Sequence, residues 1–112
     1  MIEIRACATS CEITRTQLLT VGSRGIKARF TIVGELAGLD LTACWRAGRT
    51  RFEVPISGDG AVTEVPAGLL TTPGDMVEVG VYGAGPHRRI PTVWAKVGEV
   101  RRGTAPTAGE HG

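Results

Sequence analysis

Three cysteines and two histidines are the residues of this sequence with the widest range of chemistry. Cys7 and Cys11 stand near the N-terminus and Cys44 lies in the middle of the chain. His87 is far from all of them in sequence, and His111 falls among the last residues. A structural zinc site needs about four thiolate or imidazole ligands, and an odd number of cysteines fits no disulfide framework. We therefore expect buried or half-buried thiols, with no metal site and no cofactor.

Catalysis by side chains alone needs a nucleophile, a base and a group that orients the base. His87 is the one histidine within the expected folded region, and it stands in a glycine-rich, basic loop at 83–89. The carboxylates Asp40, Asp59 and Asp75 all fall at expected turns, where aspartate commonly accepts hydrogen bonds from its own backbone. The sequence therefore predicts a protein that is not an enzyme.

Arginines and one tryptophan are the remaining candidates for contact with a partner. The arginines can form a basic rim for an acidic partner, although scattered surface arginines are the more usual explanation of such a set. Trp94 alternates out of phase with Val93, Ala95 and Val97, so it either covers an open edge of the fold or lies in an interface, where tryptophan is enriched. The candidate interface or ligand contacts are Arg24, His87, Arg88, Arg89, Trp94, Arg101 and Arg102.

The elements that must position these residues show an alternation of apolar and polar side chains with a period of two. This pattern is typical of strands with one face on a core and the other in water. It predicts strands around 2–6, 27–32, 41–45, 51–56 and 76–83, and a closing strand over 90–100. No segment of comparable length shows a helical period. We expect Phe30 and Trp45 at the centre of the core, because only five aromatic residues are present: two Phe, two Trp and one Tyr.

Glycine-rich segments separate these strands. The segments at 47–49 and 57–60 predict hairpins, because glycine tolerates the positive φ of tight turns. Residues 21–25 predict a further break, and Pro66 followed by Pro73 predicts one short helical turn near 66–72. Short strands at regular spacing predict an all-β sandwich, antiparallel, with about seven or eight strands. We expect the sandwich to span 1–102 and a flexible tail to occupy 103–112.

Composition limits the classes of function. Apolar residues make up 42% and charged residues 21%, which is typical of a globular protein. The 13 basic residues nearly balance the 11 acidic ones, so the strong phosphate attraction of nucleic-acid binding is not expected. No run approaches the ~20 apolar residues that span a bilayer, and no signal peptide is evident. The sequence thus predicts a soluble protein made in the cytoplasm, with no nucleic-acid or membrane partner.

Four stretches, taken in order, resemble the N-terminal immunoglobulin-like domain of tailed-phage and prophage proteins of the baseplate upper protein type. They are LTVGSRGIKARFTI (19–32), LAGLDLTACWRAGRTRFEVPI (36–56), VPAGLLTTPGDMVEVGVYG (65–83) and IPTVWAKVGEVRRGTAP (90–106). One turn departs from that pattern: where the family commonly carries a tryptophan, this chain reads Glu35, Leu36, Ala37, Gly38 and Leu39. A leucine can fill the same pocket.

This resemblance implies an immunoglobulin-like β-sandwich and a structural role, with no catalytic residues. The expected protein is a virion component, made in the cytoplasm of the bacterial host, that anchors or forms part of a baseplate, tail fibre or other appendage through contacts with itself and with other virion proteins. Capsid decoration, or anchoring of a fibre on the phage head, is the first alternative. A glycan-binding or polyanion-binding module, with Arg88, Arg89 and Trp94 as contacts to a cell-surface glycan, is the second.

Overall fold

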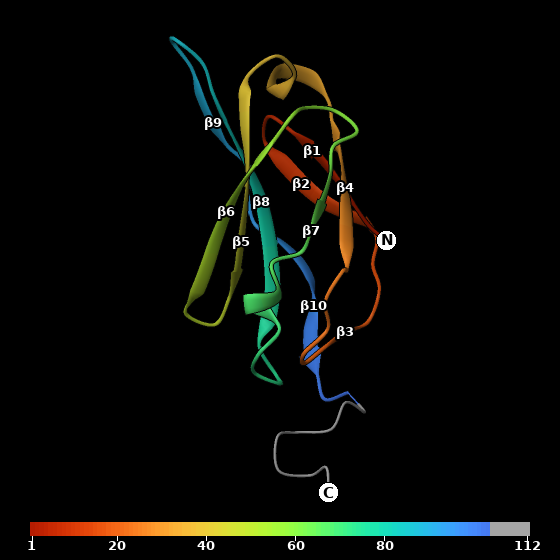
Figure 1. The fold of residues 1–112 in the computed structure, drawn as a ribbon. Coiled ribbons are helices and arrows are strands. Elements are labelled where there is room, and N and C mark those ends of the chain that lie inside the picture. The colour runs from red at the N-terminus through yellow and green to blue at the C-terminus, as the bar shows by residue number, and fades with distance from the viewer. Residues whose placement is uncertain (104–112) are drawn as a thin grey trace, which may run out of the picture.

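The computed structural model describes residues 1–103 and shows an all-β chain folded as two packed sheets (Figure 1). The predicted β-sandwich is confirmed. The strands are β1 (Ile2–Cys7), β2 (Ser10–Arg15), β3 (Leu19–Thr20), β4 (Lys27–Ile32), β5 (Asp40–Ala47), β6 (Thr50–Ile56), β7 (Val62–Glu64), β8 (Met76–Ala84), β9 (Arg89–Pro91) and β10 (Ala95–Arg101). Two short 3-10 turns complete the described elements, η1 (Gly34–Leu36) and η2 (Ala67–Leu69).

The order of the strands is that of an immunoglobulin-like sandwich. One sheet runs β2-β1-β4-β7, and the other runs β3-β10-β8-β5-β6 with β9 beside β8. In such domains the second and fifth strands pair in one sheet, and the third, sixth and seventh pair in the other. Here β4 and β7 take the first pair of places, while β5, β8 and β10 take the others. The hairpin of β1 and β2 is added to the edge of β4.

Two pairings differ from the antiparallel sandwich that the sequence predicts. β1 pairs with β4 in parallel, and β10 pairs with β3 in parallel. Parallel neighbours need a connection that crosses over, whereas a tight turn gives only antiparallel ones. Because the alternation of side chains is the same in both cases, the sequence pattern does not distinguish them. The number of described strands, ten, exceeds the expected seven or eight since several are only two or three residues long.

The core contains the apolar faces that the alternation predicts. Both sheets contribute fully buried side chains, including Ile4 and Phe30 from one sheet and Trp45 and Val79 from the other. The rings of Phe30 and Trp45 pack edge to face with centroids 6.3 Å apart, an arrangement that adds to the burial of aromatic surface. The expected centre of the core is therefore confirmed.

Strand β6 is less buried than the alternation predicts. Ile56 is buried and Val54 is half-buried, but the Phe52 residue is 38% exposed to solvent. The three side chains share the inward face, since they pair across from Leu41, Ala43 and Trp45 on β5. β6 is an edge strand, so the core covers its end only in part. There the Phe52 ring lies against Gly68 of η2, where an added Cβ would stand 2.6 Å from Cζ.

The predicted hairpin at 57–60 is wrong, and the one at 47–49 is confirmed. Ala47 pairs with Thr50 in the tight turn that joins β5 and β6. After β6, the chain instead crosses to the other sheet, where β7 pairs with β4. The crossing is held by β4: Ile32 donates its N–H to Asp59 Oδ1 at 2.9 Å, and Gly60 donates its N–H to the Phe30 carbonyl at 2.8 Å. A glycine-rich turn can thus join strands of different sheets as well as neighbouring strands of one sheet.

The closing strand is interrupted, contrary to the prediction of one strand over 90–100. β9 and β10 both pair with β8, but the residues 92–94 between them leave the ladder. Val93 in this gap is 58% exposed. The helical turn near 66–72 is confirmed as η2, whereas η1 was not predicted. The predicted tail at 103–112 lies outside the described residues apart from Gly103.

Candidate functional site

The arginines and the histidine singled out in the sequence lie at two ends of the sandwich. His87, Arg88 and Arg89 are exposed at the end of the β8–β9 hairpin, next to Ala84. β8 runs from Met76 to Ala84, and at about 3.3 Å per residue its ends lie roughly 26 Å apart. The other basic residues belong to the Met76 end. The structure therefore does not bring the candidates together as one basic rim.

The basic residues at the Met76 end come from two neighbouring segments. Arg101 pairs with Thr20 of β3, and Arg102 follows it at the surface. Arg24 is exposed in the loop that follows β3. At the opposite end, Arg88 donates a hydrogen bond to the Glu35 carboxylate of η1. Because both of these side chains are half or more exposed, this ion pair contributes little to stability.

Trp94 lies apart from Arg88 and Arg89, on the outer face of the β6-β5-β8 sheet. It stands over Gly80, where a Cβ atom would lie 3.8 Å from Cε3 of the indole. The guanidinium carbon of Arg46 is 4.0 Å from the ring centroid, and that of Arg51 is 5.5 Å away. Both distances fall within the range of cation–π attraction. The tryptophan is thus grouped with arginines of the β5–β6 hairpin.

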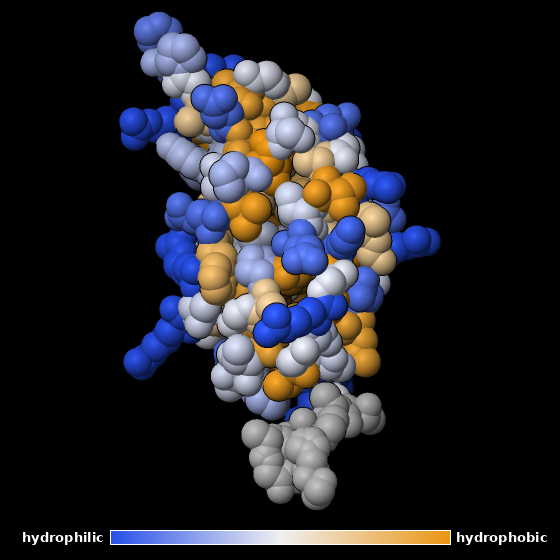
Figure 2. All heavy atoms as spheres, viewed as in Figure 1, coloured by the Kyte–Doolittle hydropathy of each residue, from blue (hydrophilic) through white to orange (hydrophobic). Residues whose placement is uncertain are grey.

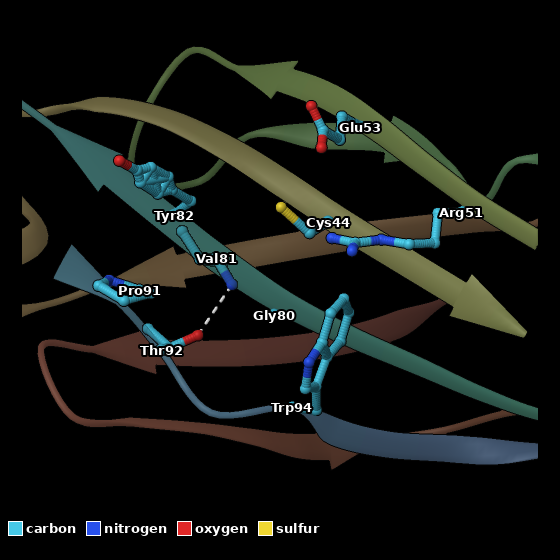
Figure 3. Close-up of a pocket in the computed structure, with 9 residues that line it drawn as sticks. All are labelled: Cys44, Arg51, Glu53, Gly80, Val81, Tyr82, Pro91, Thr92 and Trp94. Carbon is cyan, nitrogen blue, oxygen red and sulfur yellow. Dashed lines mark hydrogen bonds between the residues drawn. The ribbon is translucent and has the colours of Figure 1, made fainter. Parts of the chain in front are cut away.

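A hollow of about 260 Å³ opens beside this tryptophan (Figure 3). Its floor is low because Cys44 and Gly80, which pair across β5 and β8, are both small. Figure 3 shows Trp94 and Arg51 toward one end of the hollow and Tyr82 and Pro91 at the other. The lining residues are Cys44, Arg51, Glu53, Gly80, Val81, Tyr82, Pro91, Thr92 and Trp94.

The gap between β9 and β10 creates the place of Trp94. Thr92 makes two hydrogen bonds to Val81 at this gap: its N–H donates to the Val81 carbonyl at 2.9 Å, and its side-chain Oγ1, in place of a main-chain carbonyl, accepts from the Val81 N–H at 2.8 Å. The backbone of β8 therefore stays paired although the closing strand leaves the ladder. This irregularity re-aims the following side chain, as bulges near functional sites often do. Trp94 consequently reaches the outer face while Ala95 is buried.

Arg46 holds the indole of Trp94 through its guanidinium. Arg46 pairs with Glu78 across β5 and β8, one alternation step away from Cys44 and Gly80. Its Nε donates to Glu78 Oε1 at 3.0 Å, and both side chains are partly covered. Arg46 is not among the residues that line the hollow. The guanidinium of Arg46 thus packs on the ring from outside the hollow lining, whereas that of Arg51, 5.5 Å from the same centroid, lines the hollow.

The two charged side chains that line the hollow, Arg51 and Glu53, have opposite charges and no ion-pair partners within the described part of the chain. Arg51 and Glu53 are absent from the ion pairs of residues 1–103, although both line the hollow. Burial raises the pKa of the Cys44 thiol, the Glu53 carboxylate raises it further, and Arg51 acts in the opposite direction. The thiol is therefore neutral at physiological pH, and it adds a small, weakly polar surface to the floor.

The residues considered for metal binding and catalysis do not form a cluster. Cys7 and Cys11 belong to the β1–β2 hairpin, whereas Cys44 faces outward from the other sheet. No group of three or more His, Cys, Asp or Glu within residues 1–103 is placed to hold a metal ion. Asp59 accepts the Ile32 N–H, so its carboxylate has a structural role. The same part of the chain has no helix that is long and apolar enough to span a membrane.

The three thiols are expected to react with iodoacetamide in the order Cys7, Cys44, Cys11. The Ser10 hydroxyl, 2.8 Å from Sγ, lowers the pKa of Cys7, whereas burial raises the pKa of Cys11 to about 11. Because the thiolate is the nucleophile, raising the pH from 7 toward 9 should accelerate the alkylation of Cys7 before that of the other two thiols. Peptide mass spectrometry of the folded protein measures the order. Ser10→Ala should slow Cys7 alone, and equal rates at Cys7 and Cys11 would contradict the prediction.

No protein-family model matches the sequence, and no curated protein is significantly similar to it. The resemblance to the immunoglobulin-like domain of phage baseplate proteins therefore remains a prediction from the four quoted stretches.

Proposed function

We propose that this protein is a non-catalytic structural component of a phage or prophage virion. In this role the β-sandwich is an adaptor that anchors or forms part of a baseplate, tail fibre or other appendage through contacts with further copies of itself and with other virion proteins. The proposal joins two kinds of support, the resemblance in sequence and the open edges of the sheets.

The sequence resemblance coincides with the immunoglobulin-like part of the fold. The stretch 19–32 supplies β3 and β4, and 36–56 supplies β5 and β6. The stretch 65–83 supplies η2 and most of β8, and the last one includes most of β9 and all of β10. Only the β1–β2 hairpin precedes the first stretch. β7 lies between two of the stretches and is not covered by them. The other strands of the sandwich, from β3 to β10, fall wholly or mostly within the quoted stretches, which supports a shared fold over a chance match of separate segments.

The observation that carries the adaptor role is the free edge of β6. With seven residues, β6 is the longest edge strand of the described sheets. It also leaves the aromatic ring of Phe52 partly exposed. An unpaired edge offers main-chain donors and acceptors to a neighbouring chain, and aromatic residues are enriched in interfaces. Figure 2 shows apolar residues in several separate places on the face in view. We place the association at the edge of β6 because of its length and its unpaired main chain.

Association through β6 is testable with a pair of lysine variants. Light scattering after size exclusion should give an oligomer whose mass increases with protein concentration. Phe52→Lys should shift it toward the monomer, because an edge lysine opposes pairing between chains. Val62→Lys is the matched control, since Val62 is 44% exposed on β7, at the edge of the other sheet. Circular dichroism should show both variants folded.

Binding to particles tests the virion role itself. Purified protein should attach to virions that lack it, and electron microscopy of labelled protein should place it at the tail. Labelling over the capsid surface would favour the alternative, a decoration or head-fibre anchoring protein. A strict monomer at high concentration that also fails to bind such particles would contradict the proposed function.

A further inference from the structure

We infer that the hollow beside Trp94 is a binding site for one ring of a neutral saccharide. The inference goes beyond the proposed adaptor role, because association through β6 does not require the hollow. It rests on three features: the shape of the hollow, the fixed aromatic ring at its end, and the unpaired polar groups at its rim.

The size of the hollow suits a small ring. Its volume of about 260 Å³ lies just below the range of about 300–1,000 Å³ for drug-sized ligands. The pair of Cys44 and Gly80 forms a floor without long side chains. Tyr82 and Trp94 stand at opposite ends (Figure 3). A ligand of one ring would therefore contact aromatic surface at both ends while its remaining groups stay in water.

The indole of Trp94 is fixed before any ligand arrives. Arg46 covers one face of the ring at 4.0 Å from the centroid, and Glu78 holds Arg46 through a 3.0 Å hydrogen bond. Thr92, next but one in sequence, fixes the backbone to Val81. A ligand that packs against the part of the indole that lines the hollow therefore has little side-chain entropy to remove, which is the general advantage of a preorganised site.

The polar groups determine the chemical class of the ligand. Arg51 offers several N–H donors, Glu53 offers carboxylate acceptors, and the Tyr82 hydroxyl can do both. A sugar presents the matching surfaces, because its C–H face packs on an aromatic ring and its hydroxyls both donate and accept. The two charges make a strongly acidic ligand less suitable, since it would gain from Arg51 and be repelled by Glu53. A neutral sugar is compatible with both.

The basic loop that the sequence suggested for a glycan is not part of this site. Arg89 pairs with Ala84 at the far end of the β8–β9 hairpin, four residues along β8 from Gly80, or about 13 Å in an extended strand. Arg88 is directed to Glu35. The expected contacts of the saccharide are therefore Trp94, Arg51, Glu53 and Tyr82.

The experiment is a titration of the folded, ¹⁵N-labelled protein with saccharides, followed by NMR at the Trp94 indole N–H. The neutral probes are oligosaccharides of glucose and of N-acetylglucosamine, and the comparison probes are an oligogalacturonate and a proline-rich peptide. A neutral probe should produce a saturable shift. Trp94→Ala should weaken its affinity about tenfold or more, as measured by calorimetry, because the stacking surface is lost.

Two further variants separate the site from the fold. Arg51→Gln and Glu53→Gln remove the exposed charges at the rim and should each weaken binding several-fold while the melting temperature stays unchanged. Val93→Ala is the matched control, because Val93 adjoins Trp94 but does not line the hollow. Three results would each overturn the inference: no neutral probe shifts the indole signal, Trp94→Ala binds as well as the wild type, or the acidic or peptide probe binds more tightly. None of them changes the association expected at β6.

Discussion

Replacing Trp45 with alanine is expected to lower the free energy of unfolding by about 3–5 kcal/mol. Trp45 has no exposed surface, and its ring packs edge to face against Phe30 across the two sheets. Removing the indole leaves a large cavity between the sheets that the surrounding strands can close only in part. Urea denaturation followed by circular dichroism measures the change, and the denaturant slope should stay close to that of the wild type.

Trp45→Phe is the informative companion to the alanine variant. The indole Nε1 of Trp45 is buried and has no hydrogen-bond partner in the described structure, and a buried unpaired donor costs about 1–3 kcal/mol. Phenylalanine removes this donor together with only part of the ring, so its net cost should be well below that of alanine. Trp94→Ala, at the surface, should leave stability nearly unchanged. A similar loss for Trp45→Phe and Trp45→Ala would contradict this prediction, because it would mean that the phenyl ring recovers none of the packing that the indole provides.

The inward faces of the strands could be predicted from the sequence because burial has a simple period. Phe30 and Trp45 each stand in a segment that alternates strictly, and each is fully buried. The alternation predicts burial less accurately in an edge strand. Phe52 of β6 has the inward phase, but the core covers its side chain only in part. Strand partners are a different matter. The segment at 57–60 has the composition of a hairpin turn and instead joins two sheets, because pairing of β7 with β4 depends on contacts far apart in sequence.

The hollow beside Trp94 could be predicted only in part. Arg51 and Glu53 have the outward phase of the alternation that predicts a strand over 51–56, and they lie on the outer face of the β5–β6 hairpin. Nothing in the sequence placed Trp94 beside them, because its position depends on the gap in the closing strand and on the bonds between Thr92 and Val81. The sequence instead associated Trp94 with its neighbours Arg88 and Arg89. The short separation in sequence between Arg89 and Trp94 does not mean that their side chains are close, because residues of an extended chain move apart by about 3.3 Å per position.

Leu36 and Gly83 are expected to show strong energetic coupling. Leu36 in η1 has no exposed surface, and Leu36→Ala should cost about 2–5 kcal/mol. A Cβ atom on Gly83 would lie 2.9 Å from Cδ2 of Leu36, 3.0 Å from Cδ1 of Leu39 and 3.4 Å from Cδ2 of Leu41. Gly83→Ala alone should therefore cost about 1–3 kcal/mol through overpacking.

The double variant tests whether Leu36 fills the pocket that the family resemblance assigns to a tryptophan. In the Leu36→Ala background, the methyl group that Gly83→Ala adds would enter space that the leucine has left. The double variant should therefore be more stable than the sum of the two changes predicts, by about 0.5–3 kcal/mol. Leu69→Ala provides the control cycle, because Leu69 is equally buried but belongs to η2, and its combination with Gly83→Ala should be additive. Additivity in both cycles would mean that η1 moves away from β8 when Leu36 is shortened. In that case the turn at 34–36 is held by its backbone, and the leucine is not what fixes it to the sheet.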